Sequence, residues 1–134
     1  MEQKDLLLRY FEELGRVLAS LDEYHEKGAF RKAIEIIDEA FTELINIPLS
    51  EIKKVNAEEF SVFLEQKELN LGQLNIIAEL FFQLAQLERE EGKDSESIFS
   101  YKKALLTLEK VEQKEHSFSL DRNDRKDFIQ TRLK

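Results

Sequence analysis

Residues 28–44, GAFRKAIEIIDEAFTEL, align without gaps on residues 92–108, GKDSESIFSYKKALLTL. Both stretches begin with a glycine, which can adopt the left-handed conformation that reverses a chain after a helix. A small residue follows five positions later in each stretch, and an alanine comes seven positions after it. Seven residues are about two helical turns, so both small residues share one face and let a neighbouring helix approach closely. We therefore expect one helical hairpin to occur twice, held together at Ala33, Ala40, Ser97 and Ala104.

Apolar residues recur every three or four positions through most of the chain, which is the pattern of amphipathic helices. The first expected helix covers residues 3–27 and ends at Gly28, and the second covers residues 30–47 and ends before Pro48. A short helical turn is expected to begin at Ser50. The core predicted from these and later stripes includes Leu7, Leu14, Val17, Leu21, Ile34, Ile37, Phe41, Phe60, Phe63, Leu74, Ile77, Phe81, Leu84, Ile98, Tyr101, Leu105, Leu108, Phe128 and Ile129.

The later helices are placed by residues whose side chains can accept a hydrogen bond from the first helical turn. Asn56, with a glutamate three residues later, resembles a capping box, and Asn70 precedes the fourth long element. Asp94 or Ser95 is the expected cap of the following helix, and Asp121 is the expected cap of a short last helix. Four glycines and one proline are too few for the many turns of a β fold, so the fold class is all-α. We expect about five main helices plus a short C-terminal helix, arranged as antiparallel hairpins in an α-α superhelix or bundle.

Length and composition favour one globular domain. A chain of 134 residues with 42% hydrophobic and 36% charged residues can bury its own core. It has no cysteine, which excludes disulfides, zinc-thiolate sites and thiol nucleophiles and is compatible with a reducing compartment. We expect a cytoplasmic protein with no membrane segment, because the N-terminus lacks a secretory pattern and no apolar run approaches the ~20 residues that span a bilayer.

The charge is negative and unevenly distributed. A formal charge of −8 argues against nucleic-acid binding, which needs a basic surface. Residues 1–118 carry 25 acidic and 15 basic side chains, whereas residues 119–134 carry 3 and 5. We therefore expect a helical domain over residues 1–118 and a basic tail over residues 119–134 that forms a short helix. The tail can lie against its own domain or against a second copy of the chain.

The repeated hairpin resembles the tetratricopeptide (TPR) repeat. Neither copy has the terminal proline of that motif, and the copies lie 64 residues apart, whereas a tandem TPR array repeats every 34 or so. The chain is also similar to a family of short, uncharacterised bacterial TPR-like proteins, through residues 5–9 (Asp-Leu-Leu-Leu-Arg) and residues 28–40. That family brings no known activity. The positions that match the motif are Phe81, Leu84, Ala85, Gly92, Ser97, Tyr101 and Ala104 and, more loosely, Val17, Leu21, Tyr24, Gly28, Ala33, Ile37 and Ala40.

No catalytic, metal or cofactor site is expected. A di-metal centre in a helical bundle needs two Glu-x-x-His pairs, and only Asp22 with His25 comes near this spacing, so we interpret His25 as a solvated residue at a helix end. Phosphate-binding, dinucleotide, zinc-protease and serine-hydrolase motifs are absent from the sequence. Clustered phenylalanines at helical spacing are expected in the core, but Phe82 and Phe99 fall off the main stripes. If either is exposed, it marks a contact surface.

The favoured function is a non-enzymatic protein-interaction module that binds a protein or peptide. Stacked TPR-like hairpins form a concave face lined by the first helix of each hairpin. The alternative is a self-associating structural protein, a homodimer whose tail docks on a neighbour. A metal-dependent helical-bundle enzyme ranks third. Chosen by helical phase alone, the candidate partner-binding residues are Arg9, Arg16, Tyr24, Asn75, Gln83 and Gln86.

Overall fold

The computed structural model describes residues 3–134, with side chains from residue 8 onward, and within that part the chain is helical and has no strand. The all-α prediction is confirmed. The described residues form seven α-helices where about six were expected, because the turn near Ser50 forms a helix of its own. Leu7, a predicted core residue, lies outside the described side chains. The elements are α1 (Gln3–Glu26), α2 (Phe30–Ala40), the π-helical turn η1 (Phe41–Ile45), α3 (Leu49–Lys54), α4 (Ala57–Gln66), α5 (Leu71–Glu90), α6 (Asp94–Glu115) and α7 (Leu120–Arg132).

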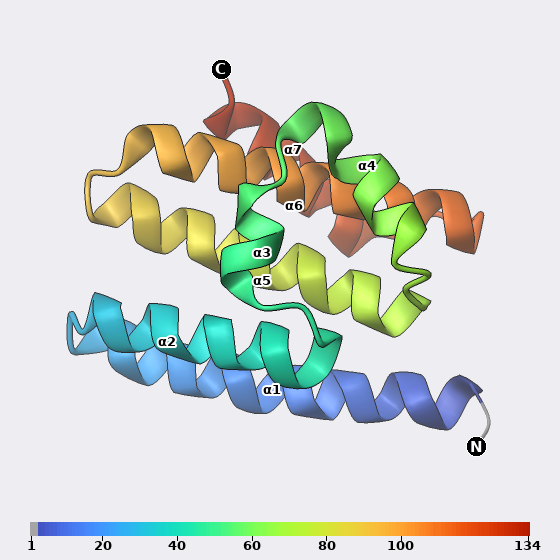
Figure 1. Cartoon of the computed structure of the whole chain (residues 1–134), viewed down its shortest axis with the longest axis horizontal. Coiled ribbons are helices and arrows are strands. Elements are labelled where there is room, and N and C mark those ends of the chain that lie inside the picture. Colours follow the sequence, from blue (N-terminus) through green and yellow to red (C-terminus); the bar gives the residue numbers. More distant parts are fainter. Residues whose placement is uncertain (1–2) are drawn as a thin grey trace.

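Four of the helices form two antiparallel pairs, and α3, α4 and α7 lie around them. α1 pairs with α2 and α5 pairs with α6, and α5 also contacts α1, α2 and η1 (Figure 1). Both α4 and α7 contact α6, with α4 crossing in front of it and α7 lying behind it in this view. The first half of α1 continues past the end of α2. α5 is therefore the central helix, which explains its broad apolar surface.

The two pairs turn and touch where the repeated sequence pattern places them. Gly28 and Gly92 have φ angles of 68° and 82°, the left-handed conformation that favours glycine. The four small residues after them, Ala33, Ala40, Ser97 and Ala104, are all buried, as predicted. Ser97 also donates a hydrogen bond from Oγ to the carbonyl of Ala85 at 2.7 Å, so its hydroxyl is not left without a partner in the interface.

Two of the four predicted caps are confirmed. Asn56 accepts a hydrogen bond from the backbone of Glu59, and Asn70 forms a reciprocal capping box with Gln73. The predicted caps of the last two helices are wrong. Asp94 and Ser95 lie inside α6, whose flanking residue is Lys93, because the turn after α5 leads the chain directly into the helix.

The cap of the last helix lies two residues earlier than predicted. Ser119 accepts the hydrogen bond from the backbone of Arg122 at 3.3 Å, so Asp121 lies in the first turn instead of at the cap. Further corrections concern the core and the second helix. Ile98, a predicted core residue, is 38% exposed, and the helix expected over residues 30–47 changes at Phe41 into the π-helical turn.

A buried lysine holds α3 against the central pair. Lys103 of α6 is 4% exposed, and its Nζ donates to the carbonyls of Ile52 and Lys53 at 3.4 and 2.5 Å. These carbonyls belong to the last turn of α3, where the helix dipole favours a cation. Burial, assisted by the nearby charge of Lys53, lowers the pKa of Lys103 to about 8. The ammonium group also lies over the rings of Phe60 and Phe81.

A buried glutamate completes this polar cluster. Glu88 of α5 is 1% exposed, and it accepts a hydrogen bond from Ser100 Oγ at 2.6 Å. Its second oxygen lies 2.8 Å from Nζ of Lys53. Buried charges are tolerated in proteins when they are paired in this way. The cluster therefore joins α3, α5 and α6 through polar contacts inside an otherwise apolar interface.

Candidate partner-binding groove

A groove of about 880 Å³ lies between α1, α5 and α7. Buried apolar side chains line its base, and Phe11 of α1 and Phe118, in the segment between α6 and α7, lie at its edges. These two phenylalanines are 58% and 77% exposed. The buried apolar residues that line the groove are Leu14, Ala78, Phe82 and Leu108.

Arg125 of α7 covers part of the groove base. Its guanidinium carbon lies 3.7 Å from the centre of the Phe82 ring, a cation–π arrangement. Its Nη1 donates to Oε2 of Glu79 at 2.8 Å, and the same oxygen accepts a hydrogen bond from Gln83 at 3.1 Å. Phe128 contacts the Phe82 ring edge-on, with centroids 5.6 Å apart. The contacts between α5 and α7 thus hold in place both the apolar base of the groove and the guanidinium group of Arg125 above it.

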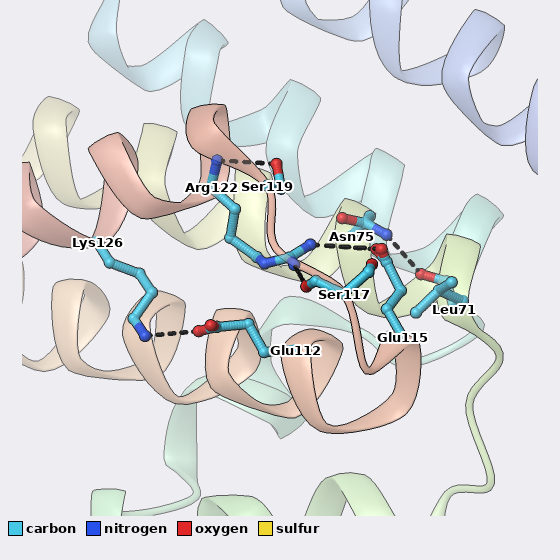
Figure 2. A network of polar contacts seen from close by, with 8 residues as sticks. All are labelled: Leu71, Asn75, Glu112, Glu115, Ser117, Ser119, Arg122 and Lys126. Carbon is cyan, nitrogen blue, oxygen red and sulfur yellow. Dashed lines mark hydrogen bonds and ion pairs between the residues drawn. The ribbon is translucent and has the colours of Figure 1, made fainter.

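Polar contacts also tie α7 to the end of α6 (Figure 2). Arg122 donates to Oε1 of Glu115 at 3.1 Å and to the carbonyl of Ser117 at 2.7 Å. One turn further along α7, Lys126 donates to Glu112 at 2.5 Å. The C-terminal segment therefore lies against its own chain and forms one wall of the groove.

A second hollow of about 220 Å³ adjoins the groove, since Gln86 lines both. It lies between the end of α1 and the end of α5. Asp22 and His25 line it from α1, and Gln83 and Glu90 line it from α5. Nε2 of His25 lies 2.5 Å from Oε2 of Glu90, so the two helix ends are bridged at this point.

The structure brings three of the six predicted contact residues together on α5. Asn75 lines the groove, Gln83 lines the second hollow, and Gln86 lines both. The amide of Asn75 already donates to the carbonyl of Leu71 at 3.0 Å, which leaves its oxygen for a partner.

The three predicted residues on α1 lie elsewhere. Arg9 is exposed, and Arg16 is exposed and pairs with Glu13. Tyr24 is half-buried, with the Lys27 ammonium 5.8 Å from its ring. None of these three is among the residues that line the groove or the second hollow.

Several groove residues were not predicted from the sequence. Phe11 lies in the first helix and Phe118 just before the last one, and neither is among the predicted contact residues. Arg122 and Arg125 belong to the tail, which was treated as a separate segment. The opposite charges of the tail and the preceding domain were the available signal that this segment forms a wall of the site.

The off-stripe phenylalanines differ in exposure. Phe82 is buried beneath Arg125, whereas Phe99 of α6 is 55% exposed with the Lys102 ammonium 5.7 Å from its ring.

In the described part of the chain, no three acidic or histidine side chains converge as metal ligands would. None of the helices described there has the length and hydropathy needed to cross a membrane. Comparison of the chain with known family models, curated proteins and solved structures finds no match.

Proposed function

We propose that this chain is a non-enzymatic protein-interaction module whose groove between α1, α5 and α7 receives a segment of a protein partner. The observation that carries the proposal is the exposure of Phe11 and Phe118 at the edges of a groove with an apolar base. Large aromatic side chains next to buried apolar surface are typical of the centre of protein interfaces. Covering these two rings would stabilise a complex by about 25 cal/mol for each Å² of apolar area removed from water.

The arrangement of the two hairpins supports a TPR-like scaffold. In such scaffolds the first helix of each hairpin lines the concave face. Here α1 and α5, the first helices of the two pairs, both contribute to the groove. The departure from a regular array lies in α3 and α4, which occupy the chain between the two pairs.

Self-association through the tail remains the second proposal. The apolar side of the tail already packs within the same chain, because Ile129 is fully buried and Phe128 contacts Phe82. Docking the tail on a neighbour would require α7 to leave this site. Light scattering of the full chain, and of a chain ending at residue 118, separates the two proposals: a monomer in both cases excludes self-association.

Quantitative affinity capture from the cells that produce the protein tests the interaction proposal. The baits are the unchanged chain, Phe11→Ser in the groove and Phe99→Ser on α6. Phe99 is a matched control because its exposed fraction, 55%, is close to the 58% of Phe11. We expect a set of proteins to be depleted with Phe11→Ser and retained with Phe99→Ser. Circular dichroism confirms that each bait is folded.

Two outcomes would contradict the proposal. Identical capture by all three baits would show that the groove binds no protein partner. Loss with Phe99→Ser alone would place the contact surface on α6, where the exposure of Phe99 already indicates a candidate surface. Direct titration of the purified candidate with the unchanged chain and both variants then gives the affinities.

A further inference from the structure

We infer that the segment bound in the groove is a basic amphipathic helix. This inference rests on the proposed function, since it specifies the partner that the groove would receive. Its support comes from three features: the charge of the residues around the groove, the arrangement of the exposed apolar side chains, and the way in which the chain already holds its own basic helix.

The charged residues that line the groove and the second hollow are predominantly acidic. They include six carboxylates and two guanidinium groups, a formal charge of −4 with His25 neutral. Both arginines are already neutralised, because Arg122 pairs with Glu115 and Arg125 pairs with Glu79. An incoming acidic segment would therefore meet repulsion, with no unpaired cation among the described lining residues to offset it.

Three exposed carboxylates remain without an ion-pair partner among the described residues. They are Asp121 and Asp124 on α7 and Asp22 on α1. Asp121 and Asp124 line the groove, and Asp22 lines the adjoining second hollow, so lysine or arginine side chains of a bound helix that extends over both hollows would reach them. Long basic side chains can extend from an apolar helix face to a polar rim in this way.

The apolar contacts expected of such a helix match the edges of the groove. Leu8 lies one turn before Phe11 on α1, and both are 58% exposed. Phe118, at 77% exposure, lines the same groove from the α6–α7 segment. An amphipathic helix places its apolar residues three and four positions apart along one face, which suits a groove with aromatic side chains at its edges.

The binding mode of α7 shows that the acidic surface of α5 and α6 already accommodates a basic helix. Arg122, Arg125 and Lys126 each have a nitrogen within 3.1 Å of a carboxylate on α5 or α6. Phe128 and Ile129 form the apolar side of the same helix and lie on the core. A partner helix with one basic and one apolar side would form the same kinds of contact, ion pairs and apolar packing, along the groove beside α7.

Fluorescence anisotropy with three labelled synthetic peptides tests the inference. The first peptide has about 18 residues, or five turns, with leucine on one face and lysine on the other. The second carries glutamate in place of lysine, and the third has the composition of the first in an order without an apolar face. We expect only the first peptide to bind, with an affinity that falls as salt is added because the attraction between charges is screened.

Matched variants locate the binding. Replacing Asp121 and Asp124 by Asn should weaken binding of the lysine peptide by about fivefold, the effect of removing two partly exposed charge pairs. Glu58→Gln with Glu59→Gln removes the same charge from α4, which does not line the groove, and should change the affinity by less than about twofold. Phe11→Ser should reduce binding in the same assay.

Each contrary result has a distinct meaning. Equal weakening by both double variants, or equal binding of the third peptide, would show general attraction to an acidic protein and overturn the inference. If the glutamate peptide binds and Phe11→Ser abolishes its binding, the groove is a binding site but not for a basic helix. If neither amphipathic peptide binds, the inference is wrong, and the capture experiment decides separately on the groove.

Discussion

Replacing Lys103 by methionine should change how the stability of the protein depends on pH. Burial lowers the pKa of Lys103 from 10.5 to about 8 in the folded protein. Between these values the unfolded chain binds the proton more tightly than the folded chain does. The free energy of unfolding must therefore rise with pH through this window. Methionine has a similar length and no charge, so the variant lacks this contribution at every pH.

The structure gives the size of the effect. A difference of about 2.5 pKa units corresponds to about 3 kcal/mol over the whole window. From about pH 7 to about pH 10, which covers most of it, the unchanged protein should gain about 2 kcal/mol of stability relative to Lys103→Met. The variant also leaves the carbonyls of Ile52 and Lys53 without their donor. That loss is independent of pH, so it shifts the free energy of unfolding of the variant by the same amount at every pH.

Urea denaturation followed by circular dichroism at a series of pH values measures this difference. Lys102→Met is the matched control, since Lys102 is the neighbouring residue on α6 and is exposed. The control should follow the unchanged protein at all pH values, because lysines and tyrosines elsewhere titrate equally in both. Parallel curves for the unchanged protein and Lys103→Met would refute the reasoning, as they would show that Lys103 is not desolvated in the fold.

Three further predictions concern the fold. Ala104→Leu should cost about 1–3 kcal/mol in thermal unfolding by overfilling the contact between α5 and α6, whereas Ala19→Leu, at an exposed position, should be nearly neutral. Gly92→Ala should lower stability by about 1 kcal/mol because φ is 82° there, while Gly15→Ala, where an added Cβ meets no atom within 4 Å, should raise it by roughly 0.5–1 kcal/mol. Removing α7 should cost about 2 kcal/mol for Ile129 alone and should increase the binding of an apolar dye; an unchanged melting curve would contradict the packing of α7.

The sequence predicted those parts of the fold that depend on local physics. Glycine turns and small residues at helical spacing are local signals, and Gly28, Gly92, Ala33 and Ala104 lie where those signals place them. Asn70 is a cap for the same reason, since capping depends on residues within one turn.

Errors arose where contacts between distant segments decide the outcome. Ile98 was expected in the core and is exposed, whereas Lys103 on the same helix is buried because the end of α3 and two aromatic rings accommodate its charge. Phe82 lies off the main stripe of α5, yet it is buried because α7 covers this side of the helix. No single-helix pattern reveals which sides of a helix its neighbours cover. For the same reason the predicted contact residues include Asn75 and Gln86, which line the groove from α5, but none of the residues that line it from α7.

The first half of α1 extends past the end of α2, so neighbouring helices support this half less than the second half. Segments with little buried apolar surface open locally at a free energy far below that of global unfolding. Leu8 and Phe11 are exposed there, whereas Leu14 and Leu21 further along are buried. Amide hydrogen exchange should accordingly slow from the start of the helix towards Leu21. The wall that α1 contributes to the groove is thus expected to open more readily than the rest of that helix, and the binding free energy of a ligand that orders it must offset the entropy lost in doing so.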